Sequence, residues 1–168
     1  MLSIPRLHKP RAKVVLKRKF VLYYLLELLF GARKQIFITF GPWVLIKVYG
    51  LPATSIAGLL MTAAIIGVVF KPLAGYAIDY LGERRVMIFD GLVLVFVCIG
   101  YGYARPIMGD DIAARTLACG CFVADNLLFA LGTSRAIYAS RIAESPQELA
   151  TTLGTGVSIN HIVSMTIP

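Results

Sequence analysis

Long apolar runs separated by short polar turns dominate this sequence. A helix that crosses a bilayer needs about 20 mostly apolar residues, and each run is long enough. The expected helices cover residues 20–49, 54–80, 85–104, 112–140 and 149–168. The pattern therefore predicts an all-α fold, a polytopic transmembrane helix bundle with four complete helices and part of a fifth.

The composition supports a membrane protein. Apolar residues make up 58% of the chain and charged residues 15%, with a mean hydropathy of +0.76. A soluble domain has roughly half apolar and a quarter charged residues. The lipid bilayer is thus the expected surrounding. Cys98, Cys119 and Cys121 all lie in apolar runs without metal-ligand spacing, so we expect no metal site and no cofactor.

Positive charge is concentrated at the start of the chain. Seven of the 17 Lys and Arg residues lie within the first 19 positions: Arg6, Lys9, Arg11, Lys13, Lys17, Arg18 and Lys19. A basic arm can bind nucleic acid, but beside a long apolar run it is typical of a cytoplasmic flank near anionic lipid. We therefore divide the chain into a basic cytoplasmic arm, 1–19, and a transmembrane bundle, 20–168, and expect no nucleic-acid partner.

The loops indicate an orientation. Arg84 and Arg85 follow the second helix and Arg141 follows the fourth, whereas the alternate loops, 50–53 and 105–111, carry none and one basic residue. Basic residues favour the cytoplasmic side, so the N terminus is predicted to be cytoplasmic in a multi-pass protein. The fifth run reaches residue 168 without a polar flank, which leads us to expect a fragment of a longer protein.

The loop after the second helix carries a motif, the signature loop of residues 75–85. Its glycines, aspartate and basic residues stand at fixed spacing: Gly75, Asp79, Gly82, Arg84 and Arg85. This loop resembles that of the major facilitator superfamily (MFS) of secondary transporters, although Glu83 stands where the family usually has Arg or Lys. In the family it is a conformational latch against the opposite half. A plain turn with topology-setting arginines is the alternative.

The resemblance extends over residues 20–168, which look like helices seven to ten and most of helix eleven of a twelve-helix bacterial transporter. The runs 31–36 and 158–161 are similar to that second half. The resemblance implies transport of a small solute by alternating access, in a bacterial plasma (inner) membrane, together with a missing transporter half.

Three polar groups of residues fall near one depth in the predicted helices. They are Arg33, Lys34 and Gln35 in the first helix, Asp125 and Asn126 in the fourth, and Asn160 and His161 in the fifth. Family transporters bind substrate near the bilayer midplane. These residues are therefore our candidates for substrate binding or proton coupling.

Their charges suggest how they are arranged. A charge at a helix centre costs about 2.5–3.5 kcal/mol on insertion scales, so we expect Asp125 to pair with Arg33 or Lys34. The remaining positive charge would suit an anionic solute, and Asp125 or His161 could couple transport to protons. As alternatives, one of the two basic residues only bridges to a neighbouring helix, and His161 is a core histidine. Arg135 and Lys71, nearer helix ends, are expected to snorkel.

Secondary active transport is the leading function. The alternative is a non-transporting membrane scaffold or assembly protein with a degenerate transporter fold. An enzyme is not expected, because the chain has no H-E-x-x-H motif, phosphate loop or evident nucleophile–base pair.

Overall fold

A computed structural model describes residues 17–167 of the chain, and every regular element in that range is helical. The long helices are α1 (Val21–Lys47), α2 (Ala53–Leu81), α3 (Glu83–Gly102), α5 (Asp111–Leu128), α6 (Thr133–Ile142) and α7 (Pro146–Thr166). Short helices precede α1 (η1, Arg18–Phe20), join α3 to α5 (α4, Ala104–Met108) and join α5 to α6 (η2, Phe129–Gly132). The all-α bundle expected from the sequence is confirmed.

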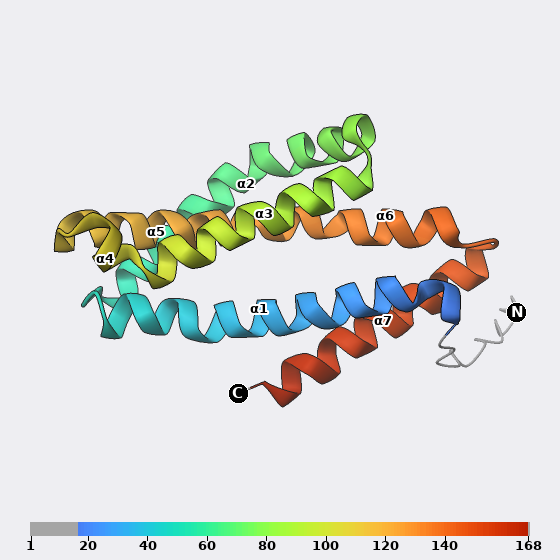
Figure 1. Ribbon diagram of the computed structural model, residues 1–168, viewed down its shortest axis with the longest axis horizontal. Coiled ribbons are helices and arrows are strands. Elements are labelled where there is room, and N and C mark those ends of the chain that lie inside the picture. Colours follow the sequence, from blue (N-terminus) through green and yellow to red (C-terminus); the bar gives the residue numbers. More distant parts are fainter. Residues whose placement is uncertain (1–16, 168) are drawn as a thin grey trace, which may run out of the picture.

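The helices run up and down along the long axis of the molecule (Figure 1). The start of α1, the α2–α3 turn and the α6–α7 loop lie at one end, and the α1–α2 turn and α4 lie at the other. The α5–η2–α6 unit contacts α1, α2 and α3, while α7 packs along α1. All three loops or flanks that the sequence predicts to be basic are therefore at the same end.

Among the described residues, three helical stretches are long and apolar enough to cross a membrane: Ala53–Leu81, Glu83–Gly102 and Asp111–Ile142, the last running through α5, η2 and α6. Helix α1 also exceeds the required length, but it carries Glu27, Arg33 and Lys34 in its first two-thirds. Helix α7 is rich in Thr, Ser and Asn. The two more polar helices are the ones that pack together.

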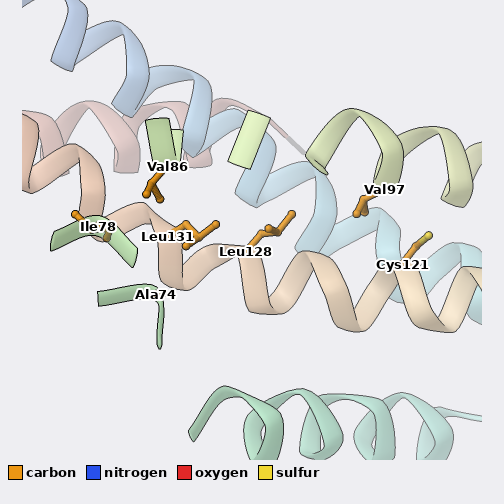
Figure 2. Packing of buried hydrophobic residues seen from close by; sticks show 7 residues of the cluster. All are labelled: Ala74, Ile78, Val86, Val97, Cys121, Leu128 and Leu131. Carbon is orange, nitrogen blue, oxygen red and sulfur yellow. The ribbon is translucent and has the colours of Figure 1, made fainter. Parts of the chain in front are cut away.

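Small and branched apolar residues from α2, α3 and the α5–α6 unit form one buried cluster. Its members are Ala74, Ile78, Val86, Val97, Cys121, Leu128 and Leu131, and Figure 2 shows them between these helices. A second cluster around Leu45 and Phe122 lies toward the α4 end, and a third around Phe20 and Tyr23 lies where α1 begins. Most other large apolar side chains are exposed, as expected for a surface that faces lipid.

The helix ends follow local sequence signals. Gly82 between α2 and α3 has φ 84° and ψ 152°, a conformation available almost only to glycine. The Ser145 side chain accepts a hydrogen bond from the Glu148 amide and caps α7. The region 105–111, expected to be a loop, contains the short helix α4 instead, and Asp110 then caps α5 through the Ala113 amide.

The basic flank of α1 pairs with the acidic α6–α7 loop. Lys17 donates to Glu148 at 2.6 Å, and Lys19 donates to Glu144 at 2.8 Å and to Glu148 at 2.9 Å. The hydrogen bond from Lys17 is the largest of several that lower the pKa of Glu148 to about 2. The rest of the predicted basic arm, residues 1–16, lies outside the described residues.

Candidate functional site

Arg33, near the middle of α1, joins three helices through its guanidinium. Its Nη2 donates to Asp125 Oδ1 on α5 at 2.7 Å, and its Nη1 lies 3.8 Å from Asp90 Oδ2 on α3. The Asp125 side chain is 1% exposed and the Arg33 side chain 12%. The expected pairing of Asp125 is thus realised with Arg33, and one guanidinium serves two carboxylates.

A second polar network lies on another face of α1. Lys34 Nζ donates to Asn160 Oδ1 on α7 at 3.3 Å, and Asn160 Nδ2 donates to Glu27 Oε2 at 3.4 Å. Glu27 and Lys34 are seven residues apart, which is close to two helical turns, so they share this face. Arg33 is about 100° away around the helix and therefore reaches different partners.

Arg135 completes the second network and does not snorkel, contrary to the expectation from sequence. Its Nε donates to Glu27 Oε1 at 2.9 Å, its side chain is 10% exposed, and its guanidinium lies 3.6 Å from the centroid of the Phe30 ring. A Cβ at Gly132 would lie 2.9 Å from Nη2 of Arg135. The glycine therefore leaves room for the guanidinium to turn back along the helix toward α1.

The charges of the two polar networks balance. The count made from the sequence did not, because it left out Glu27, Asp90 and Arg135. The two networks together contain three cations, Arg33, Lys34 and Arg135, and three carboxylates, although Lys34 contacts the neutral amide of Asn160. The carboxylates are Glu27, Asp90 and Asp125. The residual positive charge expected from Arg33, Lys34 and Asp125 alone is therefore absent from these two networks. An anionic solute would therefore need another cation to bind it.

The remaining candidates are dispersed. Gln35 donates to Thr39 on its own helix at 3.4 Å, and Asn126 donates to the Phe122 carbonyl at 2.8 Å. His161 is exposed on α7 and joins neither network among the described residues, so it is not the core histidine considered as an alternative. Of these three, only Asn126 lines a cavity among those described.

Two adjoining cavities separate α2 from α1 and α5. One of about 120 Å³ is bordered by Phe37, Leu60, Asp125 and Asn126, and the other, of about 180 Å³, by Leu60, Lys71 and Asn126 among others. Leu60 and Asn126 belong to both walls. Asp125, the partner of Arg33, therefore lies in the wall of a mostly apolar space between helices, which is the type of place where bundles bind small ligands.

In the signature loop, Glu83, the residue that departs from the family pattern, is the one that forms an ion pair. Glu83 begins α3, is 7% exposed, and forms an ion pair with Arg141, whose Nη2 lies 3.1 Å from Glu83 Oε2. Arg84, Arg85 and Asp79 are exposed, and Asp79 makes no ion pair within the described residues. Glu83 thus connects the α2–α3 turn to the end of α6 through Arg141.

Gly82→Ala should destabilise the fold by about 1–3 kcal/mol, because alanine at φ 84° is strained. Gly75→Ala is the matched control in the same motif. Gly75 is helical, and a Cβ there has open space, so this variant should gain about 0.5–1 kcal/mol. Unfolding by sodium dodecyl sulfate in mixed micelles measures both. Equal stabilities of the two variants would show that the turn adapts without strain.

The residues that the sequence analysis missed as site candidates include Glu27, Asp90, Arg135 and Arg141. A signal for the first two was present, because an acidic residue inside an apolar run is costly and is retained for a partner or a function. Arg141 gave no such signal, since a basic residue in a cytoplasmic loop is already explained by orientation.

The comparisons identify the family. The model of the Major Facilitator Superfamily matches residues 3–168. No curated protein and no solved structure matches the chain. With the match covering nearly the whole sequence and the helices forming an apolar bundle with polar networks inside, the chain belongs to the Major Facilitator Superfamily of membrane transporters.

Proposed function

We propose that the chain is part of a secondary active transporter that moves a small solute by alternating access. The family match over residues 3–168 carries this proposal. It is supported by the ionised groups inside the bundle, which are costly in a membrane and are most often found on transport pathways. The cavities between α1, α2 and α5 provide a place for a solute.

The proposal includes a second half that faces these cavities, because transporters of this kind hold substrate at the interface of two repeats. It also includes a cytoplasmic N terminus in a bacterial plasma membrane. In its support, the described basic flank, Lys17–Lys19, precedes α1 at the end of the molecule where the α2–α3 turn and the α6–α7 loop also lie (Figure 1).

Proton coupling through Asp125 is part of the proposal. Asp90 and Asp125 share one guanidinium, and Asp125 Oδ2 and Asp90 Oδ1 are buried without a hydrogen-bond partner among the described residues. If Asp90 and Asp125 together bound one proton, their remaining single negative charge would balance the positive charge of Arg33. His161, exposed on α7, is the less suited of the two proton-coupling candidates.

Counterflow in proteoliposomes tests transport with the complete gene product. Vesicles loaded with unlabelled solute should accumulate the labelled form, for one class among organic carboxylates, phosphate, sugars, amino acids and amines. Lys34→Gln and Asp125→Asn should each slow exchange at least tenfold, whereas Lys47→Gln, at the exposed end of α1, should not.

A scaffold with a degenerate transporter fold gives a different result in the same assay. It would exchange none of the solutes, although its purified form keeps its helical circular dichroism. If exchange occurs but neither Lys34→Gln nor Asp125→Asn alters it, transport stands and the polar networks are structural.

A further inference from the structure

Lys71 on α2 is an exposed lysine without a counter-charge among the described residues. Lys71 on α2 borders the cavity of about 180 Å³ between α2 and α5. It makes no hydrogen bond or ion pair with any described residue, and no acidic residue borders that cavity. By contrast, the cations of the two polar networks, Arg33, Lys34 and Arg135, are all bonded to side chains. Lys71 therefore has its positive charge available for a ligand.

The side chain of Lys71 extends back along α2 toward Gly67 and not toward the nearer helix end. A Cβ at Gly67, one turn earlier, would lie 3.9 Å from Lys71 Cε. This is the usual direction of helical side chains, which point toward the N-terminal end of their helix. Lys71 is about 15 Å from Leu81 at the near end of α2, at 1.5 Å per residue. The expected snorkelling to that end is therefore not what the structure has.

The cavity offers an anion more than a point charge. Asn126 borders it and uses its amide to donate to the Phe122 carbonyl, which leaves the side-chain oxygen to accept a hydrogen bond. The remaining wall is apolar and contains small residues at Ala63, Ala64 and Gly67. Its volume is below the roughly 300–1,000 Å³ of pockets for drug-sized ligands. The site thus combines a cation, one acceptor and apolar walls in a small space.

We propose that Lys71 and Asn126 form the anion-binding end of the solute site, and that the solute is a small organic carboxylate. The proposal rests on the proposed transport function and assigns the charge selectivity to Lys71 in place of Arg33 and Lys34. The ammonium binds the carboxylate, Asn126 accepts from a hydroxyl or amino group, and the apolar walls hold the carbon chain. Phosphate and the headgroup of an anionic lipid share part of this chemistry, so both are tested.

Ligand-dependent thermal unfolding of the purified complete protein in neutral detergent provides the first test. The probes are butyrate, lactate, succinate, inorganic phosphate, short-chain phosphatidylglycerol and uncharged butyramide. At least one carboxylate should raise the unfolding temperature, because it binds only the folded state, and Lys71→Gln should weaken that binding at least tenfold. Lys47→Gln, also an exposed lysine of the bundle, should leave it unchanged.

Several outcomes overturn the proposal. They are stabilisation by phosphate or phosphatidylglycerol alone, equal binding by Lys71→Gln and the unaltered protein, and no stabilisation by any carboxylate. Counterflow separates this failure from that of transport. Exchange of a solute with no dependence on Lys71 would leave the transporter intact, whereas Lys71-dependent binding without exchange would leave the site intact.

Accessibility of position 71 gives a second test that does not need a known solute. Cys98, Cys119 and Cys121 are replaced by alanine, and Lys71→Cys is treated in vesicles with a negatively charged methanethiosulfonate. A cavity open to water should give labelling at least tenfold faster than at Val69→Cys, which is exposed about 200° around α2 and should face lipid. Equal labelling rates would overturn the cavity assignment.

Discussion

Arg33→Gln should be the most destabilising substitution in the interior, with a loss of about 3–5 kcal/mol in the free energy of unfolding. Among the described residues, Arg33 is the only cation that forms ion pairs with Asp90 and Asp125. Its removal leaves the buried carboxylate of Asp125 and the partly buried one of Asp90 without a counter-charge. Unfolding by sodium dodecyl sulfate in mixed micelles, followed by helical circular dichroism, measures the loss.

The carboxylate variants are the controls because each leaves one ion pair in place. Asp125→Asn keeps Arg33 beside Asp90 and should cost about 1–3 kcal/mol, the range for a lost buried hydrogen bond. Asp90→Asn should cost less, since its oxygen lies 3.8 Å from the guanidinium against 2.7 Å for Asp125. The triple variant Arg33→Gln, Asp90→Asn, Asp125→Asn should recover part of the loss. If Arg33→Gln cost no more than Asp125→Asn, one guanidinium would not be serving two carboxylates.

The sequence was sufficient for the helices and for one ion pair, because both follow from the cost of polar groups in lipid. An apolar run of bilayer length predicts a helix, and Asp125 in such a run predicts a cation nearby. The choice of Arg33 over Lys34 was left open. Spacing along α1 shows only that the two residues diverge by about 100°, while the partner of each depends on which helix covers that face.

The parts that could not be predicted depend on contacts between distant segments. Asp90 on α3 becomes part of the site because α3 and α5 both pack near Arg33, and Arg135 is buried because Gly132 leaves space beside it. Lys71 appeared close enough to a helix end to reach water. In the structure its side chain points away from that end and borders a cavity, and neither feature can be predicted from the hydropathy of the run.

Gly156→Ala should separate α7 from α1 and cost about 1–3 kcal/mol, the usual range for overpacking. A Cβ at this position would lie 2.7 Å from Cε1 and 2.8 Å from Cζ of Tyr23 on α1. Tyr23 is 2% exposed and packs edge-on against Tyr24, so its ring has little room to turn aside. The loss is measured by unfolding in mixed micelles, together with faster hydrogen exchange in α7.

Gly154→Ala, two residues earlier on the same helix, is the matched control. A Cβ there meets no atom within 4 Å, so the variant should be more stable by about 0.5–1 kcal/mol. A double-mutant cycle then locates the clash. Tyr23→Leu removes the ring atoms that the new methyl group meets, so Gly156→Ala should cost less in that background than in the unaltered protein. Strictly additive effects would mean that Gly156 is needed for a reason other than its contact with Tyr23. The close approach of α7 to α1 would then depend on Gly31, because a Cβ there would lie 3.0 Å from the Asn160 carbonyl oxygen.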